Sequence, residues 1–434
     1  RGNGTSPRLQ AWGYDGPSGR PETKMSDSRA FRFRIYPTPE QEMILLRDIE
    51  TCRRLWNDAL GQRKERWEGK RESVSYPDQC RELTLIKKDN PFVASLYSHV
   101  AQDVLRRLDK AFTAFFRKVS RYPKFKAYRE YGSFTYPDAY NGSVKLGVSG
   151  RKVYLSKVGY VPVVVHREVP KDGTLKTATV SRKADGKWYV AFVYEVEEPA
   201  PSKVSVPQSP LGIDLGLTNL IATSDGLLIE TPRFLRKAEK ALARADRQLA
   251  RKKKGSANRR KALHNRAVKF SRVARQREDF AHKVSAMLVS GHDALFFEDL
   301  KVERMGRARP YSKSIHDAGW AQLKAFAEYK MARKGGIVLS VPPEYTSQDC
   351  NACGSRGHVG RGQQVYRCPV CGTTANRDVN ASQNILERGM SMVRRDTPEP
   401  TTPVETAALL AASMPQATAV WEAGTILARH PDVS

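Results

Sequence analysis

Four cysteines arranged as two Cys-x-x-Cys pairs are the feature that most constrains how this chain folds. Cys350 and Cys353 form the first pair, and Cys368 and Cys371 form the second after an interval of fourteen residues. This spacing predicts one structural Zn²⁺ bound by all four thiolates, because each pair can hold the metal from one tight turn. The alternative is four thiols that bind no metal. Asp378 follows the last cysteine by seven residues, so we expect this module to deliver a carboxylate to an active site.

The balance of charges indicates a polyanionic partner. The 434-residue chain, long enough for two or three domains, carries 74 Lys or Arg against 46 Asp or Glu, a net charge of +28. Such an excess favours nucleic acid over an anionic membrane as the partner. The chain contains no run of eighteen apolar residues, so we expect neither a transmembrane helix nor a membrane partner.

Neither end of the chain is expected to fold. Residues 1–28 are rich in Gly, Pro, Ser and Arg, and residues 392–434 are rich in Pro, Thr and Ala. These compositions bury too little apolar surface to form a stable core, so both segments are predicted to be disordered. Met25 is not followed by the apolar segment of a secretory signal. Four of the six cysteines lie in metal-type pairs, as suits a reducing compartment, and we therefore expect a cytoplasmic protein.

Two separated segments show the alternation that is typical of a β-sheet. Apolar and basic residues alternate over residues 31–35, and a period of two returns over residues 134–196. Within the second segment, Asp185-Gly186 is a typical hairpin turn, because both residues accept a positive φ. We predict that residues 29–37 and 133–205 together form one small β-barrel.

The intervening residues 38–132 are predicted to form a helical domain inserted into this barrel. Thr38 and Gln41 have the spacing of an N-cap and its capping-box partner. A later helix over residues 105–119 has an exposed side rich in Arg and Lys, which is either a solvated face or a surface for phosphates. Residues 121–126 interleave Tyr and Phe with Arg and Lys. That pattern can stack on bases while cations hold phosphates, and the alternative is an ordinary linker.

A second domain, of α/β type, is predicted from residues 206–345 and 376–391, interrupted by the cysteine module at residues 346–375. Residues 233–285 are expected to form a helical hairpin, because apolar residues recur there every three to four positions. Between residues 231 and 283 lie 19 Lys or Arg and 4 Asp or Glu, a local net charge of +15. Charge at this density repels itself unless phosphates neutralise it, so we expect the hairpin to bind nucleic acid.

Three carboxylates are the candidate catalytic residues. Asp214 and Glu298 each end a predicted strand, and Asp378 opens a helix beyond the cysteine module. We expect the three side chains to converge at the strand ends of a mixed sheet, where they can hold two Mg²⁺ (or Mn²⁺) ions about 4 Å apart. One ion would activate a water molecule, and the other would stabilise the leaving 3′ oxygen of a phosphodiester. The alternative for each acid is an ordinary surface carboxylate.

Two glycines and two further acids lie near these candidates in the sequence. Gly212 and Gly216 flank Asp214 in sequence, and we interpret them as leaving room for the close approach of a bulky polyanion. Asp293 and Asp299 are the next candidate acids, and we interpret both as surface residues.

Eight short motifs match those of a known family, in the same order along the chain. They are Phe33-Arg-Ile-Tyr-Pro-Thr-Pro-Glu-Gln41, Tyr122-Pro-Lys-Phe-Lys126, Gly212-Ile-Asp-Leu-Gly216, Phe297-Glu-Asp-Leu300, Asp317-Ala-Gly-Trp320, Thr346-Ser-Gln-Asp-Cys-Asn-Ala-Cys-Gly354, Cys368-Pro-Val-Cys-Gly372 and Arg377-Asp-Val-Asn-Ala381. Through them the chain resembles the TnpB proteins of bacterial insertion sequences and the compact type V CRISPR effectors derived from them. The motifs extend over nearly the whole length from residue 31 to residue 386, and jointly they are specific.

The resemblance implies an α/β multidomain architecture. It implies a RuvC nuclease domain with an RNase H-like fold and an inserted zinc ribbon, residues 346–375, that loads the target strand. It also implies that the barrel is a wedge domain carrying an inserted helical recognition domain. Asp214, Glu298 and Asp378 fall on the three RuvC acids, and the four cysteines fall on the zinc positions. Asn376 stands where relatives often have an acid, a departure that removes no expected metal ligand.

The function implied by the resemblance is that of a Mg²⁺-dependent, RNA-guided DNA endonuclease in the cytoplasm of a bacterium or archaeon. Such a protein binds a structured guide RNA, reads a short motif beside its target in double-stranded DNA, and holds an RNA–DNA heteroduplex. Arg53, Arg54 and Asn57 are candidate contacts to that motif. Because all three acids are present, we expect an active nuclease. The alternatives are an RNA-guided DNA-binding regulator with little or no nuclease activity and an accessory protein of transposition.

Overall fold

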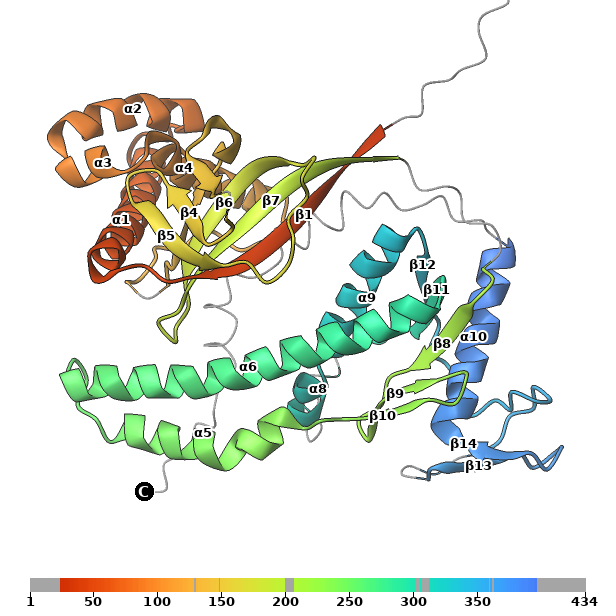
Figure 1. Cartoon of the computed structure of the whole chain (residues 1–434). Helices are drawn as coiled ribbons and strands as arrows, with labels where there is room; N and C mark the ends of the chain where they lie inside the picture. The colour runs from red at the N-terminus through yellow and green to blue at the C-terminus, as the bar shows by residue number, and fades with distance from the viewer. Residues whose placement is uncertain are drawn as a thin grey trace, which may run out of the picture.

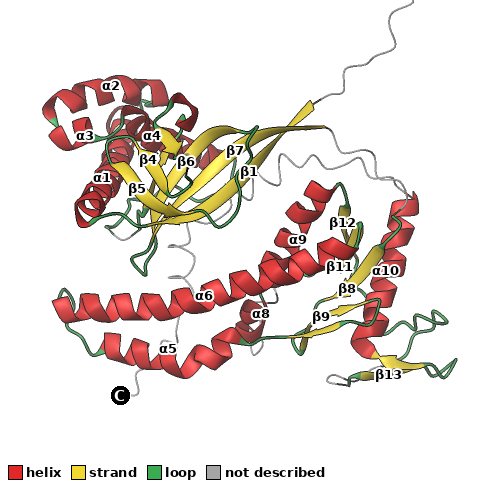
Figure 2. Ribbon diagram, in the orientation of Figure 1, coloured by secondary structure: helices red, strands yellow, loops and turns green. Residues whose placement is uncertain are grey.

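Two large β-sheets, each covered by its own helices, organise the protein (Figures 1 and 2). One sheet has seven strands and lies in the N-terminal half of the chain, and the other has five strands and lies in the C-terminal half. The computed structural model describes residues 24–128, 130–147, 149–199, 207–301, 305, 312–358, 360 and 363–395.

The long strand β1 (Lys24–Ile35) lies in the middle of the seven-stranded antiparallel sheet, whose order is β2-β6-β7-β1-β5-β4-β3. It pairs along its whole length with β7 (Trp188–Pro199) and at its C-terminal end with β5 (Gly159–Val164). Phe31 and Phe33 are buried, as the predicted alternation requires. The remaining strands are β2 (Ser133–Tyr136), β3 (Val144–Leu146), β4 (Lys152–Leu155) and β6 (Thr174–Arg182).

Two features of this sheet bear on the predictions, one confirming and one correcting them. A turn joins β6 to β7 at Asp185-Gly186 as predicted, with Gly186 at a φ of 78°. The predicted disordered extension of residues 1–28 is too long, because residues 24–28 belong to β1. Their backbone pairs with residues 195–199 of β7, a partner too distant in sequence for local composition to reveal. Residues 1–23 lie outside the described residues.

Helices α1 (Pro39–Lys70) and α4 (Ser98–Phe116) pack against the first sheet. The predicted capping box begins α1: Thr38 accepts from the backbone of Gln41, and the Gln41 side chain accepts from the backbone of Thr38. The buried residues of both helices and of the sheet form one hydrophobic core, so helices and sheet are a single folded unit. Between these helices lie two shorter ones that the sequence analysis did not identify, α2 (Tyr76–Asp89) and α3 (Pro91–Ser95).

The basic and aromatic segment 121–126 is held against α1 by hydrogen bonds. The side-chain amide of Asn57 donates to the carbonyl of Lys126 at 3.0 Å, and its oxygen accepts from the Lys126 amide at 2.7 Å. Arg53 donates to the same carbonyl at 2.8 Å. Arg53 and Asn57 therefore stabilise this loop, and their contact with a DNA motif stays a prediction.

The five-stranded sheet is mixed, as predicted, with the order β10-β9-β8-β11-β12. β11 (Ala294–Glu298) runs parallel to both of its neighbours, β8 (Pro210–Asp214) and β12 (Ile337–Val341). β9 (Asn219–Thr223) and β10 (Leu228–Glu230) continue the sheet as an antiparallel hairpin. Because β8 and β11 point the same way, their carboxyl ends lie at one edge.

Two helices follow one another before β12. Gly319, which has a φ of 68°, separates α8 (Ser312–Ala318) from α9 (Trp320–Lys334). The helix expected to open at Asp378, beyond the cysteine module, is the 19-residue α10 (Arg377–Arg395). Its apolar side packs on the five-stranded sheet, and it overlaps the predicted disordered tail at residues 392–395. The rest of that tail, residues 396–434, lies outside the described residues.

The predicted basic hairpin is formed by α5 (Phe234–Ala250) and α6 (Ala257–Gly291), which lie side by side in Figure 1. Asp317 links the two helices near the N-terminus of α5, because its carboxylate accepts from the Leu235 amide at 3.0 Å and from Nε of Arg277 in α6 at 3.0 Å. Although α6 has 35 residues, neither it nor any other described helix is apolar enough over a sufficient length to cross a membrane.

Candidate active site and zinc site

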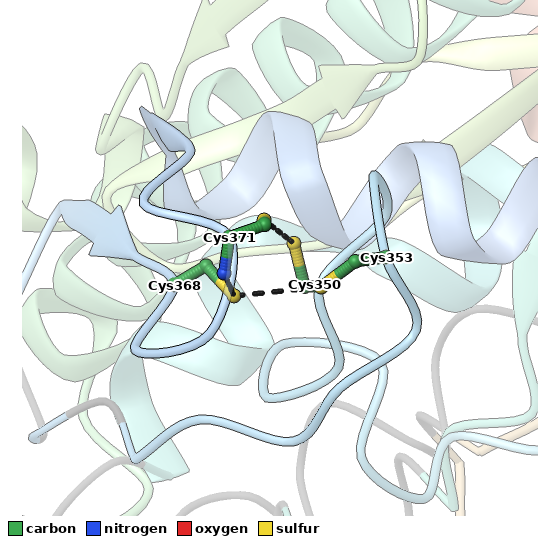
Figure 3. A group of neighbouring side chains, drawn as sticks. All are labelled: Cys350, Cys353, Cys368 and Cys371. Carbon is green, nitrogen blue, oxygen red and sulfur yellow. Dashed lines mark hydrogen bonds between the residues drawn. The ribbon is translucent and has the colours of Figure 1, made fainter.

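The four cysteines come together at one point beside α10, as Figure 3 shows. Their sulfur atoms all lie within 4.8 Å of one another. Sγ of Cys350 is 3.7 Å from that of Cys371, and Sγ of Cys353 is 3.6 Å from that of Cys368. A tetrahedron of sulfurs around Zn²⁺ with bonds of about 2.3 Å has edges of about 3.8 Å, so the donor set fits this metal.

Each Cys-x-x-Cys pair is built as a tight turn that ends in glycine. The amide of Gly354 donates to the carbonyl of Cys350 at 2.8 Å, and the amide of Gly372 donates to that of Cys368 at 3.2 Å. Both glycines have a φ near 70°, 72° and 73° respectively, which residues with a Cβ rarely adopt. Hydrogen bonds from Ser355 and from backbone amides lower the pKa of the Cys368 thiol to about 5, which favours the thiolate that a metal binds. The strands β13 (Val365–Arg367) and β14 (Thr374–Asn376) lead into and out of the second turn.

The parallel pairing of β8 and β11 brings two of the predicted acids to one edge of the five-stranded sheet. Phe297 lies opposite Ile213, so the following residues, Glu298 and Asp214, are at adjacent strand ends. Asp378 is the second residue of α10, which packs across β8. The three acids thus come from three separate elements, as expected.

Burial and mutual repulsion link the three carboxylates electrostatically. Burial, the largest cause, and the charges of Glu298 and Asp378 together raise the pKa of Asp214 to about 8, and the charge of Arg377 opposes them. Burial likewise raises the pKa of Glu298 above its usual value, opposed by a hydrogen bond from Thr346. A buried group of acids that repel one another is stabilised when a divalent cation is bound among them.

The structure does not bring the three acids into a shared coordination sphere. Within the described residues, the four cysteines are the one group of His, Cys, Asp or Glu side chains arranged to hold an ion as they stand. Asp378 instead accepts a hydrogen bond from the side-chain amide of Asn219 at 3.0 Å. Glu298 accepts one from the hydroxyl of Thr346. The two acids are therefore oriented by neighbouring polar groups, and their direct ligation of Mg²⁺ stays a prediction.

Asn219 and Thr346 are functional-site residues whose roles the sequence analysis missed. Thr346 lies in one of the eight motifs and Asn219 lies three residues after another, but neither position indicates a hydrogen bond to an acid from a distant element. Asp293, interpreted above as a surface residue, is half-buried, and its carboxylate accepts from the amides of Gln208 and Ser209, just before β8.

One side of α10 holds the loop that leads into the cysteine module. Asn384 donates to the carbonyls of Thr346 and Asp349 at 2.8 and 2.7 Å. Asn380 donates to the Asp349 carbonyl at 2.8 Å, and Arg388 donates to the Asp349 carboxylate at 3.0 Å. Positions 380, 384 and 388 are one helical turn apart and share a face. This face therefore fixes both the residue that contacts Glu298 and the first zinc-binding turn.

The packing of α10 requires glycine at position 212, which differs from the interpretation given to Gly212 above. A Cβ on Gly212 would lie 2.1 Å from the carbonyl oxygen of Ser382 and 2.6 Å from the amide of Leu386, both in α10. The interpretation of Gly212 as space for a polyanion is wrong, because the space is filled by α10. Gly216 allows a tight turn, since a Cβ there would lie 2.6 Å from the carbonyl oxygen of Asn219. Asn376, which stands where relatives often have an acid, caps α10, because its side-chain oxygen accepts from the Asp378 amide at 2.9 Å.

Comparison with known proteins places this architecture in a family. Family profiles match three segments: "Probable transposase" (OrfB_IS605) at residues 191–309, "Cas12f1-like, TNB domain" at residues 320–385, and a "Helix-turn-helix domain" of the same OrfB_IS605 type at residues 25–72. The putative RNA-guided DNA endonuclease InsQ of Escherichia coli (strain K12) is 33% identical over 387 residues, which cover 85% of this chain and 94% of that protein. The chain belongs to the TnpB family.

A second relative and one solved structure are also similar to this TnpB-family chain. A putative RNA-guided DNA endonuclease of Streptomyces pristinaespiralis is 34% identical over 368 residues, which cover 84% of this chain and 90% of that protein. Among solved structures, that of a Cas12f1–sgRNA–target DNA complex has a similar fold, with a TM-score of 0.50 at 14% identity over 83% of this chain and 98% of that one. The segment matched as helix-turn-helix is, in this TnpB protein, the strand β1 followed by the single long helix α1.

Proposed function

We propose that this TnpB-family chain is an RNA-guided DNA endonuclease that hydrolyses a phosphodiester bond at Asp214, Glu298 and Asp378. The observation that carries the proposal is the position of three acids: Asp214 and Glu298 end the adjacent parallel strands β8 and β11, and Asp378 begins α10, which packs across β8. Burial, together with the charges of the other two acids, raises the pKa of Asp214 to about 8. Relatives of similar length that are named putative RNA-guided DNA endonucleases support the same activity.

The chemistry we propose is metal-assisted hydrolysis of the RuvC type. Two Mg²⁺ (or Mn²⁺) ions, when bound by the three carboxylates, supply an activated water and stabilise the leaving 3′ oxygen. The residues of the chain supply the orientation: Thr346 holds the carboxylate of Glu298, and Asn219 holds that of Asp378. The four cysteines hold one structural Zn²⁺ that keeps the loop bearing Thr346 in place.

The proposed partners are a guide RNA, target double-stranded DNA and the heteroduplex between them. Support comes from the basic hairpin, where Lys237, Lys240, Arg244 and Arg247 recur along α5 every three to four residues and are exposed. Phosphates are the groups that neutralise such a row, and the contacts carry no sequence information of their own. Base pairing with the guide then selects the target, and the protein reads only a short motif beside it.

The experiment that tests the proposal compares two neighbouring acids. Protein purified with its copurifying RNA is incubated with Mg²⁺ and a DNA target matched to that RNA. Glu298→Gln is expected to abolish cutting while RNA and target binding persist. Asp299→Asn is the matched control, because this exposed side chain follows Glu298 directly, and it should cut at the wild-type rate. Wild-type protein that binds the matched target tightly and leaves it uncut would instead identify an RNA-guided DNA-binding regulator.

A further inference from the structure

An exposed aromatic side chain stands beside the proposed active site. Tyr345 directly precedes Thr346, whose hydroxyl donates to Glu298. Thr346 is 3% exposed, whereas Tyr345 is 48% exposed, so one residue supports the acid and its neighbour is presented to solvent. The backbone of Tyr345 has a φ of 62°, the left-handed region that bulky residues rarely adopt. The fold therefore holds the backbone that carries this ring in an uncommon conformation.

Arg356 lies over the ring and is itself fixed. Its Cζ atom is 3.5 Å from the ring centroid of Tyr345, and its Nε donates to a carboxylate oxygen of Asp349 at 2.9 Å. The other carboxylate oxygen of Asp349 accepts from Arg388 of α10 at 3.0 Å. A continuous set of contacts thus runs from α10 to an exposed aromatic ring with a guanidinium on it, and the Arg356 side chain remains 54% exposed.

We propose that Tyr345 and Arg356 form a stacking site for one unpaired base of the strand that enters the carboxylate site, an inference that rests on the proposed nuclease function. Aromatic rings and guanidinium planes both stack on bases, and this requires no particular sequence. The guanidinium also attracts the adjoining phosphate. A single strand of nucleic acid offers both a base and a phosphate. The chain's net charge of +28 favours such a polyanion as the partner over the surface of another protein. Stacking one residue away from Thr346 sets which phosphate reaches Glu298.

The first test removes the ring without adding strain. Tyr345→Gly deletes the stacking surface and accepts the positive φ freely, whereas Tyr345→Phe keeps the surface. With protein, copurified RNA and matched DNA, we expect Tyr345→Gly to cut roughly ten-fold more slowly than wild type, given the usual contribution of one stacked base. Tyr345→Phe should cut at close to the wild-type rate. Cutting by Tyr345→Gly at the wild-type rate would overturn the inference.

The second test separates stacking from bracing of the zinc module. Targets carrying one abasic nucleotide, moved along the cut strand, should show one position at which the missing base slows wild type as much as Tyr345→Gly does. At that position the abasic target should slow Tyr345→Gly no further. The opposite result is that the abasic nucleotide slows wild type and Tyr345→Gly by the same factor at every position, and that Tyr345→Gly contains less zinc. That result would show that Tyr345 and Arg356 only stabilise the zinc module, and it would overturn the inference.

A third measurement does not depend on cutting. With 2-aminopurine at the same position of the bound target, stacking quenches its fluorescence in the wild-type complex, and Tyr345→Gly should restore the signal. A complex that binds its target without cutting it would contradict the proposed nuclease function, and quenching that Tyr345→Gly abolishes would still support the stacking site. Absence of quenching at every position tested in a bound target would overturn it.

Discussion

The side-chain amide of Asn219, at the start of β9, donates a 3.0 Å hydrogen bond to Oδ2 of Asp378, at the start of α10. This bond joins the two elements that flank β8, the strand that ends in Asp214. It leaves one carboxylate oxygen of Asp378 oriented by the sheet, so Asn219 is a positioning residue for the proposed site.

Replacing Asn219 should therefore impair cleavage more than binding. Asn219→Ala removes the hydrogen bond and is expected to slow cutting roughly ten-fold or more, since groups that orient metal-binding side chains commonly have effects of this size. Asn219→Asp should be slower still, because it adds a charge beside acids that already repel one another. Single-turnover cleavage rates and target binding would be measured side by side. Thr218→Ala, at an exposed neighbouring position, is the control and should behave as wild type.

Thr346 provides a prediction about the metal requirement. Its hydroxyl donates to the Glu298 carboxylate and stabilises the charged form, so Thr346→Val should weaken Mg²⁺ binding while keeping the side-chain shape. We expect the Mg²⁺ concentration that gives half-maximal cutting to rise roughly ten-fold or more. Thr346→Ser retains the hydroxyl and should need about as much Mg²⁺ as wild type. An unchanged requirement in Thr346→Val would remove Thr346 from the site.

Whether a contact of this site could be predicted from the sequence depends on how many residues separate its partners along the chain. The cysteine spacing is a local pattern, and it predicted the convergence of the four sulfurs. Asp214 and Glu298 were found because each follows an apolar strand. The bond between Asn219 and Asp378 spans 159 positions, and no local pattern encodes it. Gly212 was misinterpreted for the same reason: its neighbour, α10, begins more than a hundred residues later.

The buried pair of Asp317 and Arg277 predicts a large effect on stability. Asp317 is 5% exposed, and its carboxylate accepts from Arg277 and from the Leu235 amide at the beginning of α5. Asp317→Ala removes both interactions at once and should lower the free energy of unfolding by about 3 kcal/mol or more. Denaturant unfolding would measure this. Asp279→Ala, which removes an exposed partner of Lys283, should change the free energy by less than about 1 kcal/mol.

Metal analysis tests the zinc site directly. We expect about one Zn²⁺ per chain, and Cys368→Ser should lose it together with cutting, because the loop that carries Thr346 enters the first zinc-binding turn. Cys80→Ser is the matched control, since Cys80 lies in α2, away from the module, and should keep both. A folded, active protein that contains no zinc would refute the assignment.

Gly212 offers a test of how closely α10 must approach the sheet. Any Cβ there would overlap the backbone of α10, at 2.1 Å from the Ser382 carbonyl oxygen, so the helix must move if Gly212→Ala is to fold. Overpacking of this kind typically costs about 1–3 kcal/mol, and we expect the upper part of that range because backbone atoms cannot rotate away. The movement would also displace Asp378, so cutting should fall further than the loss of stability alone explains. Gly69→Ala, on an exposed turn of α1 with no atom within 4 Å, should instead raise stability slightly. Wild-type stability and cutting in Gly212→Ala would show that α10 does not position Asp378 through this contact.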